Sequence, residues 1–175
     1  MTDLFLTIPN ESYLDQIAAY RQEFLDAGSS MDGTGPLRRS EDPAAWLDFV
    51  LKNMKPETTP ENLVPATQLL FIRREDNALV GMLQLRHYFN DYLSKFGGHI
   101  GYSIRPSERR KGYAKEMLRQ ALPLCREVGL DRVLITCIDG NLGSEKTILA
   151  NGGVYESTVH EPDRNIDLKR FWIQL

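Results

Sequence analysis

Residues 101–114 read GYSIRPSERRKGYA, and this stretch decides the fold. An alternating strand pattern ends at Pro106, a polar loop follows, and helical spacing of apolar residues continues over 113–128. The first N–H groups of such a helix have no intrahelical acceptor, and the helix dipole favours an anion beside them. Gly112 allows a close backbone approach, and the three cations at 109–111 add attraction. The turn therefore predicts a phosphate-binding site, with a solvated basic helix start as the alternative interpretation.

The segments around this turn predict an alternation of strands and helices. Strands at 99–105 and 132–138 flank the helix, and such a βαβ unit places its two strands side by side and parallel. The strands at 67–74 and 78–87 are joined by a tight turn and are expected to form an antiparallel hairpin. The other expected elements are a strand at 4–8, helices at 11–25, 43–54 and 143–151, and strands at 154–159 and 168–174. The stretch 88–96 fits either a short helix or a loop.

Length and composition favour one domain over residues 1–175. The chain is 42% hydrophobic, which is enough for a continuous core, and it has no apolar run of about eighteen residues and no secretory pattern at its start. We therefore expect a cytoplasmic protein without a membrane partner. The net charge of −3 provides no basic field for nucleic acid, and the histidines and cysteines lack the spacing of metal ligands. Cys125 and Cys137 lie in apolar patterns and are expected to be buried, reduced thiols.

A resemblance to a known family is carried by residues 104–114. The run RRKGYA at 109–114 matches the signature Arg/Gln-x-x-Gly-x-Gly/Ala, and Ile104-Arg105-Pro106 matches the strand ending that precedes it. The chain thus resembles the GNAT superfamily of N-acetyltransferases over nearly its whole length. It looks most like a bacterial branch of predicted acetyltransferases, with GGHIGY at 97–102 as a recognisable feature. The resemblance implies an α/β fold, with a mixed, mostly antiparallel sheet, a splayed central pair of parallel strands and helices on both faces.

The resemblance also implies acetyl-CoA as the acyl donor, and it implies which residues bind the pantetheine arm and which bind the pyrophosphate. The main chain near Ile104 is expected to pair with the pantetheine arm like an added strand, and Asn141 and Ser144 are expected to contact the same arm. Helix capping by Asn141 and solvent contact by Ser144 are the local alternatives. The pyrophosphate is expected on the backbone N–H groups of Arg109, Arg110, Lys111, Gly112, Tyr113 and Ala114.

The predicted catalytic groups are less complete than the predicted cofactor site. Many members of this superfamily place a tyrosine acid seven residues after the asparagine, where this chain has Ile148. Thr147, Tyr155, a water, or departure of the thiolate without an acid stay open. His99 is the candidate general base, because its unperturbed pKa near 6.5 suits proton removal at neutral pH. A structural hydrogen bond at the strand edge is the alternative role for His99.

The acceptor side of the predicted site is defined only by candidate residue types. His87 is a second histidine that can face the cleft. Asp91 and Asp139 are possible ammonium binders, with loop capping as the alternative role for each. Four aromatic residues can line an acceptor pocket or lie in the core: Trp46, Tyr88, Tyr92 and Phe96.

The expected function is transfer of an acetyl group from acetyl-CoA to a primary amine of a small molecule or a peptide, by direct attack in a ternary complex. An acyl-CoA-binding sensor with little or no turnover is the rival from another class, because Ile148 replaces the usual acid. A site for some other nucleotide is a weaker third possibility, since neither a P-loop nor a dinucleotide fingerprint is present. A homodimer through the C-terminal strands is possible.

Overall fold

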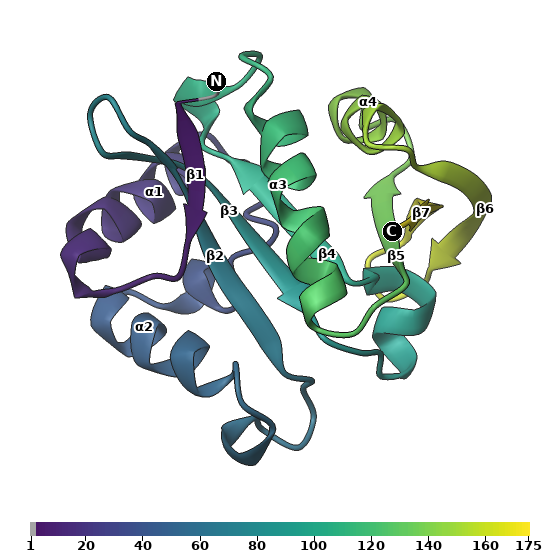
Figure 1. Ribbon diagram of the computed structural model, residues 1–175, viewed down its shortest axis with the longest axis horizontal. Helices are drawn as coiled ribbons and strands as arrows, with labels where there is room; N and C mark the ends of the chain where they lie inside the picture. Colours follow the sequence, from purple (N-terminus) through teal and green to yellow (C-terminus); the bar gives the residue numbers. More distant parts are fainter. Residues whose placement is uncertain (1–2) are drawn as a thin grey trace.

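The computed structural model describes residues 3–175 as two antiparallel sheets with helices packed on them (Figure 1). The first sheet has the order β1-β2-β3-β4 and the second has the order β5-β7-β6. The strands are β1 (Leu4–Thr7), β2 (Ala66–Arg73), β3 (Ala78–Arg86), β4 (Ile100–Ile104), β5 (Arg132–Ile138), β6 (Val154–Glu161) and β7 (Ile166–Gln174). The helices are α1 (Leu14–Asp26), α2 (Pro43–Lys52), α3 (Tyr113–Glu127) and α4 (Leu142–Ala150). The predicted α/β class is confirmed.

Two of the helices, α2 and α4, begin at a residue whose side chain caps them. Asp42 caps α2 by accepting the Ala44 N–H at 2.9 Å, and Pro43 occupies the first position of the helix. The first helix was expected from residue 11, but Glu11–Tyr13 form a 3₁₀ turn and α1 starts at Leu14. The ambiguous stretch at 88–96 contains a single π-helical turn, Leu93–Gly97. Within residues 3–175, no helix combines the length and apolar character needed to cross a bilayer.

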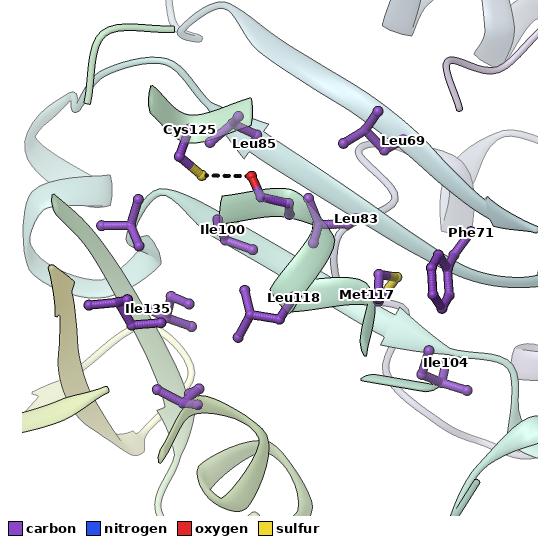
Figure 2. Close-up of a cluster of buried hydrophobic side chains, with 14 of the residues drawn as sticks. Leu69, Phe71, Leu83, Leu85, Ile100, Ile104, Met117, Leu118, Cys125 and Ile135 are labelled. Atoms are coloured by element: carbon purple, nitrogen blue, oxygen red, sulfur yellow. Dashed lines mark hydrogen bonds between the residues drawn. The ribbon is translucent and has the colours of Figure 1, made fainter. Parts of the chain in front are cut away.

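Two apolar clusters fix the helices on opposite faces of the first sheet. The α1 and α2 side is built around Tyr20, Trp46 and Met82. On the other face, Met117 and Leu118 of α3 pack against strand residues that include Leu83, Ile100 and Ile104 (Figure 2). This second cluster also takes in Cys125, Cys137 and residues of β5 and β7, so it joins the two sheets. Both cysteines are buried and unpaired, as predicted.

The two sheets meet at one point, where β4 begins beside β5. The His99 N–H donates to the Leu134 carbonyl oxygen at 2.8 Å, and the Leu134 N–H donates to His99 Nδ1 at 2.9 Å. Beyond this joint β4 and β5 share no ladder, and their arrows point the same way but diverge (Figure 1). The predicted parallel pair is therefore present and splayed. Its gap opens toward the first turns of α3 and α4.

Candidate active site

The loop before α3 leaves backbone donors without partners. Arg110 and Gly112 both have left-handed backbone angles, with φ of 63° and 79°, and they turn the chain sharply into the helix. The first helical hydrogen bond runs from the Glu116 N–H to the Gly112 carbonyl oxygen, and no side chain caps the helix. The N–H groups of Tyr113 and Ala114 therefore stay free. A Cβ built on Gly112 meets nothing within 4 Å, so the space in front of these donors is open.

Ion pairs and hydrogen bonds hold this loop in place and engage two of its three cations. Glu108 Oε2 accepts from Arg73 Nη1 at 2.8 Å and from Lys111 Nζ at 2.6 Å. Burial raises the pKa of Glu108, but the hydrogen bonds and charges of Arg73 and Lys111 outweigh burial and lower it. Arg109 turns inward and donates to the Ile104 carbonyl oxygen at 3.1 Å and to Ser29 Oγ at 2.8 Å. Of the three consecutive cations, only Arg110 has no side-chain partner within residues 3–175.

A cleft of about 570 Å³, here called the cofactor cleft, lies between the start of α3, the edge of β4 and the start of α4. Lys111 does not line it, whereas the unpredicted Asp32 and Lys115 do. The other predicted cofactor-binding residues all line this cleft: Ile104, Arg109, Arg110, Gly112, Tyr113, Ala114, Asn141 and Ser144.

The edge of β4 that faces the cleft can accept an extended ligand. The Arg86 N–H donates to the His99 carbonyl oxygen at 2.7 Å, and the Arg105 N–H donates to the Val80 carbonyl oxygen at 2.9 Å. In an antiparallel ladder these bonds alternate along the strand, so the N–H and carbonyl groups of Tyr102 and Ile104 point away from β3, although the Ile104 carbonyl already accepts from Arg109. An extended amide-containing arm can therefore add to this edge.

Asn141 has the capping role that was the local alternative for it, and Ser144 is joined to β4 through Tyr102. Asn141 caps α4, because its Oδ1 accepts the Ser144 N–H at 3.2 Å, and both residues line the cofactor cleft. Ser144 Oγ lies 2.7 Å from the Tyr102 hydroxyl, which bridges β4 and α4. Burial raises the pKa of Tyr102 to about 12, so the phenol stays protonated at neutral pH.

A second space, here called the transfer cavity, adjoins the cofactor cleft and has a volume of about 220 Å³. The lining that it shares with the cleft consists of Ser30, Asp32, Tyr102, Asn141 and Ser144. Phe96, Arg86 and Arg164 line it further on. Asp32 is the only carboxylate in its lining. The two spaces therefore adjoin along this shared lining, the larger at the start of α3 and the smaller beside Phe96, Arg86 and Arg164.

His99 has a structural position in this arrangement. It lines neither space, its Nδ1 accepts the Leu134 N–H, and its ring stacks on Phe89 with the centroids 4.0 Å apart. Burial, and then the charges of Arg86 and Arg132, lower the pKa of His99 to about 4. The geometry thus gives no support to the prediction that His99 is the general base, and it matches the alternative structural role.

The low pKa of His99 makes a prediction about stability. A histidine that is neutral and buried in the fold takes up its proton more readily after unfolding, where its pKa is near 6.5. The folded state is therefore expected to lose stability as the pH falls from about 6.5 toward 4. Urea unfolding at pH 7 and pH 4.5 measures the loss. His99→Asn, which keeps an acceptor but does not titrate, should show a smaller loss, and an equal loss in both proteins contradicts this role.

Ile148, which stands where the family places its tyrosine acid, is fully buried in the core and carries no proton to donate. Of the candidates for the acid, Thr147 lines the cofactor cleft and is only 9% exposed. Tyr155 is 53% exposed, and its hydroxyl pairs with Thr158 Oγ1 away from the spaces described.

Of the candidates on the acceptor side, Tyr92 and Phe96 line the transfer cavity, but Asp91 and Asp139 do not. Trp46 is buried and donates to the Thr34 carbonyl oxygen at 2.8 Å, and Tyr88 lies exposed outside the cavities. His87 Nε2 pairs with Thr67 Oγ1 at 2.8 Å.

The family follows from a comparison of the sequence with family models. The model described as the acetyltransferase (GNAT) domain matches residues 5–154. The chain belongs to this family. The family assignment agrees with the free N–H groups at the start of this GNAT chain's α3 and with its splayed strands. No protein with a curated description matches the sequence.

Solved structures with the same fold cover nearly the whole chain. The ribosomal-protein-S5-alanine acetyltransferase from Vibrio fischeri has a TM-score of 0.75 and 16% identity, over 99% of this chain and 94% of that chain. RimL, a ribosomal L7/L12 alpha-N-protein acetyltransferase in complex with coenzyme A, has a TM-score of 0.74 and 15% identity, over 100% and 96%. A chimera of the spermidine N-acetyltransferase SpeG from Vibrio cholerae and hSSAT has a TM-score of 0.68 and 16% identity, over 99% and 96%. At these identities the likeness shows the fold alone.

Proposed function

We propose that this chain transfers an acetyl group from acetyl-CoA to a primary amine of a small molecule or a peptide, by direct attack in a ternary complex. The observation that carries the proposal is the set of unpaired N–H groups at the start of α3, which opens into a cleft that continues into a smaller cavity. The donors and the Arg110 charge suit a pyrophosphate, and the free edge of β4 suits the amides of pantetheine. The coenzyme A bound to RimL supports the same donor.

Asp32 is the group that receives the amine in this proposal. Its carboxylate lies where the cofactor cleft and the transfer cavity meet, and it is exposed enough to exchange protons with solvent. An ammonium beside a carboxylate is held by charge and can pass one proton to it or to a bound water. The neutral nitrogen then attacks the thioester carbonyl carbon, the N–C bond forms, and the C–S bond breaks. The second nitrogen proton leaves by the same carboxylate or water.

Tyr102 and Ser144 supply the proton for the departing thiolate in this proposal. The two hydroxyls lie 2.7 Å apart and line both the cleft and the transfer cavity, so a proton that leaves Tyr102 is replaced through Ser144. This pair takes the place of the tyrosine that the family places where Ile148 stands. It also makes an enzyme a better interpretation than an acyl-CoA sensor, because a sensor needs no proton donor where the cleft adjoins the transfer cavity.

Release of free thiol from acetyl-CoA in the presence of a panel of primary amines tests the function. The wild type is expected to release thiol with at least one amine, and Tyr102→Phe is expected to lower kcat by about a hundred-fold with little change in the KM for acetyl-CoA. Tyr155→Phe is the matched control, since it removes an exposed hydroxyl that lines no cavity described above.

Three outcomes separate the parts of this proposal. Thiol release by the wild type supports the transferase assignment. Equal rates in the wild type and Tyr102→Phe overturn the role of Tyr102 but leave the transferase assignment in place. Saturable stabilisation by acetyl-CoA without thiol release for any amine favours the sensor instead.

A further inference from the structure

A third space extends the transfer cavity on its far side. This side cavity has a volume of about 360 Å³ and lies between α2, the end of β3 and the turn that contains Leu93. Arg86 and Tyr92 line both spaces and form the connection between them. Much of the wall is apolar, with Phe49, Val64 and Leu93 among its residues. A ligand that enters the transfer cavity can therefore extend a side chain into a mainly apolar pocket.

The charges around the side cavity are all positive. Arg39 and Arg86 line it, and its lining contains no aspartate or glutamate. Asp32 and Arg86 both line the transfer cavity, and the negative charge of Asp32 favours the charged form of Arg86. Arg164 also lines the transfer cavity, but it is paired with Glu161. Among residues 3–175, the two connected spaces therefore present one carboxylate, Asp32, and two guanidinium groups without a carboxylate partner, Arg39 and Arg86.

Arg86 is a guanidinium with unused hydrogen-bonding capacity. Its Nε donates to Gln84 Oε1 at 3.1 Å and its Nη1 donates to the Gly97 carbonyl oxygen at 3.1 Å, but Nη2 has no acceptor within residues 3–175. No carboxylate of these residues forms an ion pair with it. Burial lowers the pKa of Arg86 to about 10. Arg86 is half-buried, and a partly desolvated guanidinium without a carboxylate partner can accept an anionic group from a ligand.

Asn53 adds an independent sign of a ligand in the side cavity. It is only 5% exposed, it lines the cavity, and its Oδ1 has no hydrogen-bond partner. An unpaired buried amide oxygen costs about 1–3 kcal/mol, which a ligand with a polar group can recover. The amide can also rotate by half a turn and present its N–H groups, so it can serve a donor or an acceptor.

We infer that the amine acceptor is a free amino acid with an apolar side chain, whose carboxylate binds Arg86 while its amine lies toward Asp32. This inference rests on the proposed function. The zwitterion matches these two opposite charges of the transfer cavity, and its side chain extends among Phe49, Val64 and Leu93. A polyamine fits poorly, because its second cation would meet Arg86 and Arg39 in a pocket without a carboxylate. A peptide N-terminus lacks the carboxylate beside its amine.

A comparison of leucine, leucinamide and spermidine as acceptors tests the inference on the unaltered protein. Leucinamide keeps the side chain of leucine but has a neutral amide in place of the carboxylate. Because this change also lowers the pKa of the amine, kcat/KM is compared per neutral amine for the two acceptors. Since a hydrogen bond to a charged group contributes about 1.5–3 kcal/mol, leucine is expected to have a kcat/KM about ten-fold to a hundred-fold above that of leucinamide. Spermidine should be acetylated more slowly than either.

Two variants assign the preference to the side cavity. Arg86→Gln is expected to lower the kcat/KM for leucine, so that the ratio of kcat/KM between leucine and leucinamide falls toward one. Arg86 also donates to the Gly97 carbonyl oxygen, so its replacement removes a backbone contact as well as the charge. Arg39→Glu is therefore the second variant. Arg39 is exposed, and its reversal should raise the KM for leucine about ten-fold without altering the thermal stability. Arg126→Glu, the same reversal at an exposed site on α3 that lines no cavity described here, should leave the KM unchanged.

The outcomes distinguish this inference from the proposed function. If acetyl-CoA stabilises the protein and leucinamide or spermidine is acetylated as well as leucine, the amino-acid acceptor is wrong and the transferase assignment stands. If acetyl-CoA stabilises the protein and none of the three releases thiol, the amino-acid acceptor is again wrong. If acetyl-CoA does not bind at all, both proposals fail together.

Discussion

Gly112→Trp is expected to lower the affinity for acetyl-CoA by at least about a hundred-fold while the protein stays folded. The Cβ of residue 112 points into open space in the cofactor cleft, so an indole there fills the position in front of the free N–H groups of α3. Loss of two charge-assisted hydrogen bonds, each of about 1.5–3 kcal/mol, accounts for a change of this size. A thermal-shift titration with acetyl-CoA measures the affinity of both proteins.

Gly129→Trp is the matched control for this experiment. Gly129 also has a left-handed φ, of 94°, and open space around its Cβ, but it follows the other end of α3 and lines no cavity described above. Both substitutions carry a similar backbone strain of about 1 kcal/mol, so they should lower the melting temperature alike. Only the variant at 112 should lose the response to acetyl-CoA. Saturable stabilisation of Gly112→Trp at wild-type concentrations would place the pyrophosphate elsewhere.

The turn before α3 could be predicted from the sequence because its chemistry is local. A strand that stops at Pro106, a glycine at the helix start and free N–H groups are all features of consecutive residues, and the structure places them as expected. Lys111 shows the limit of this argument. Its charge is visible in the sequence, but its partner Glu108 is fixed by Arg73 from β2, so the ammonium is turned toward an ion pair and away from the cleft.

The acceptor side could not be predicted because its residues meet only in the folded chain. Asp32 lies in a glycine-rich loop whose sequence indicates nothing more than a turn. That loop rests on β4 because Gly33, with φ of 73°, has no Cβ: a Cβ there would lie 2.3 Å from the Gly101 carbonyl oxygen. Arg86 comes from the end of β3 and faces the same space. Contacts between such distant segments carry no pattern in a single sequence.

His99 is a candidate general base in the sequence because of its position at the start of the strand that precedes the signature loop, and the same position explains its structural role. The residue before it, Gly98, has φ of 67° and ψ of −170°, a combination that is accessible almost only to glycine. This backbone turn directs the His99 ring toward β5, where Nδ1 receives the Leu134 N–H. A strand pattern predicts which side chains point to each face of the sheet, but it does not predict a backbone turn of this kind immediately before the strand.

Gly98→Ala is accordingly expected to lower the free energy of unfolding by about 3 kcal/mol or more. A Cβ at residue 98 would lie 2.5 Å from the Leu134 carbonyl oxygen, which is a backbone atom and cannot move without opening the joint between the sheets. The His99 N–H to Leu134 bond and the Leu134 N–H to His99 bond would be lost with it. Urea unfolding at pH 7 measures the change in the free energy of unfolding.

Gly140→Ala separates the effect of the joint from the cost of removing a glycine. Gly140 has φ of 94° and nothing within 4 Å of its Cβ position, so its substitution adds backbone strain of about 1 kcal/mol without a clash. Equal destabilisation by the two alanines would mean that the contact at Leu134 contributes nothing. A larger loss at residue 98, with faster hydrogen exchange at the Leu134 amide, would locate the loss at the joint. Because β4 and β5 diverge from this backbone joint, the same residues also set the width of the gap between the two strands, which is the gap proposed here for the cofactor arm.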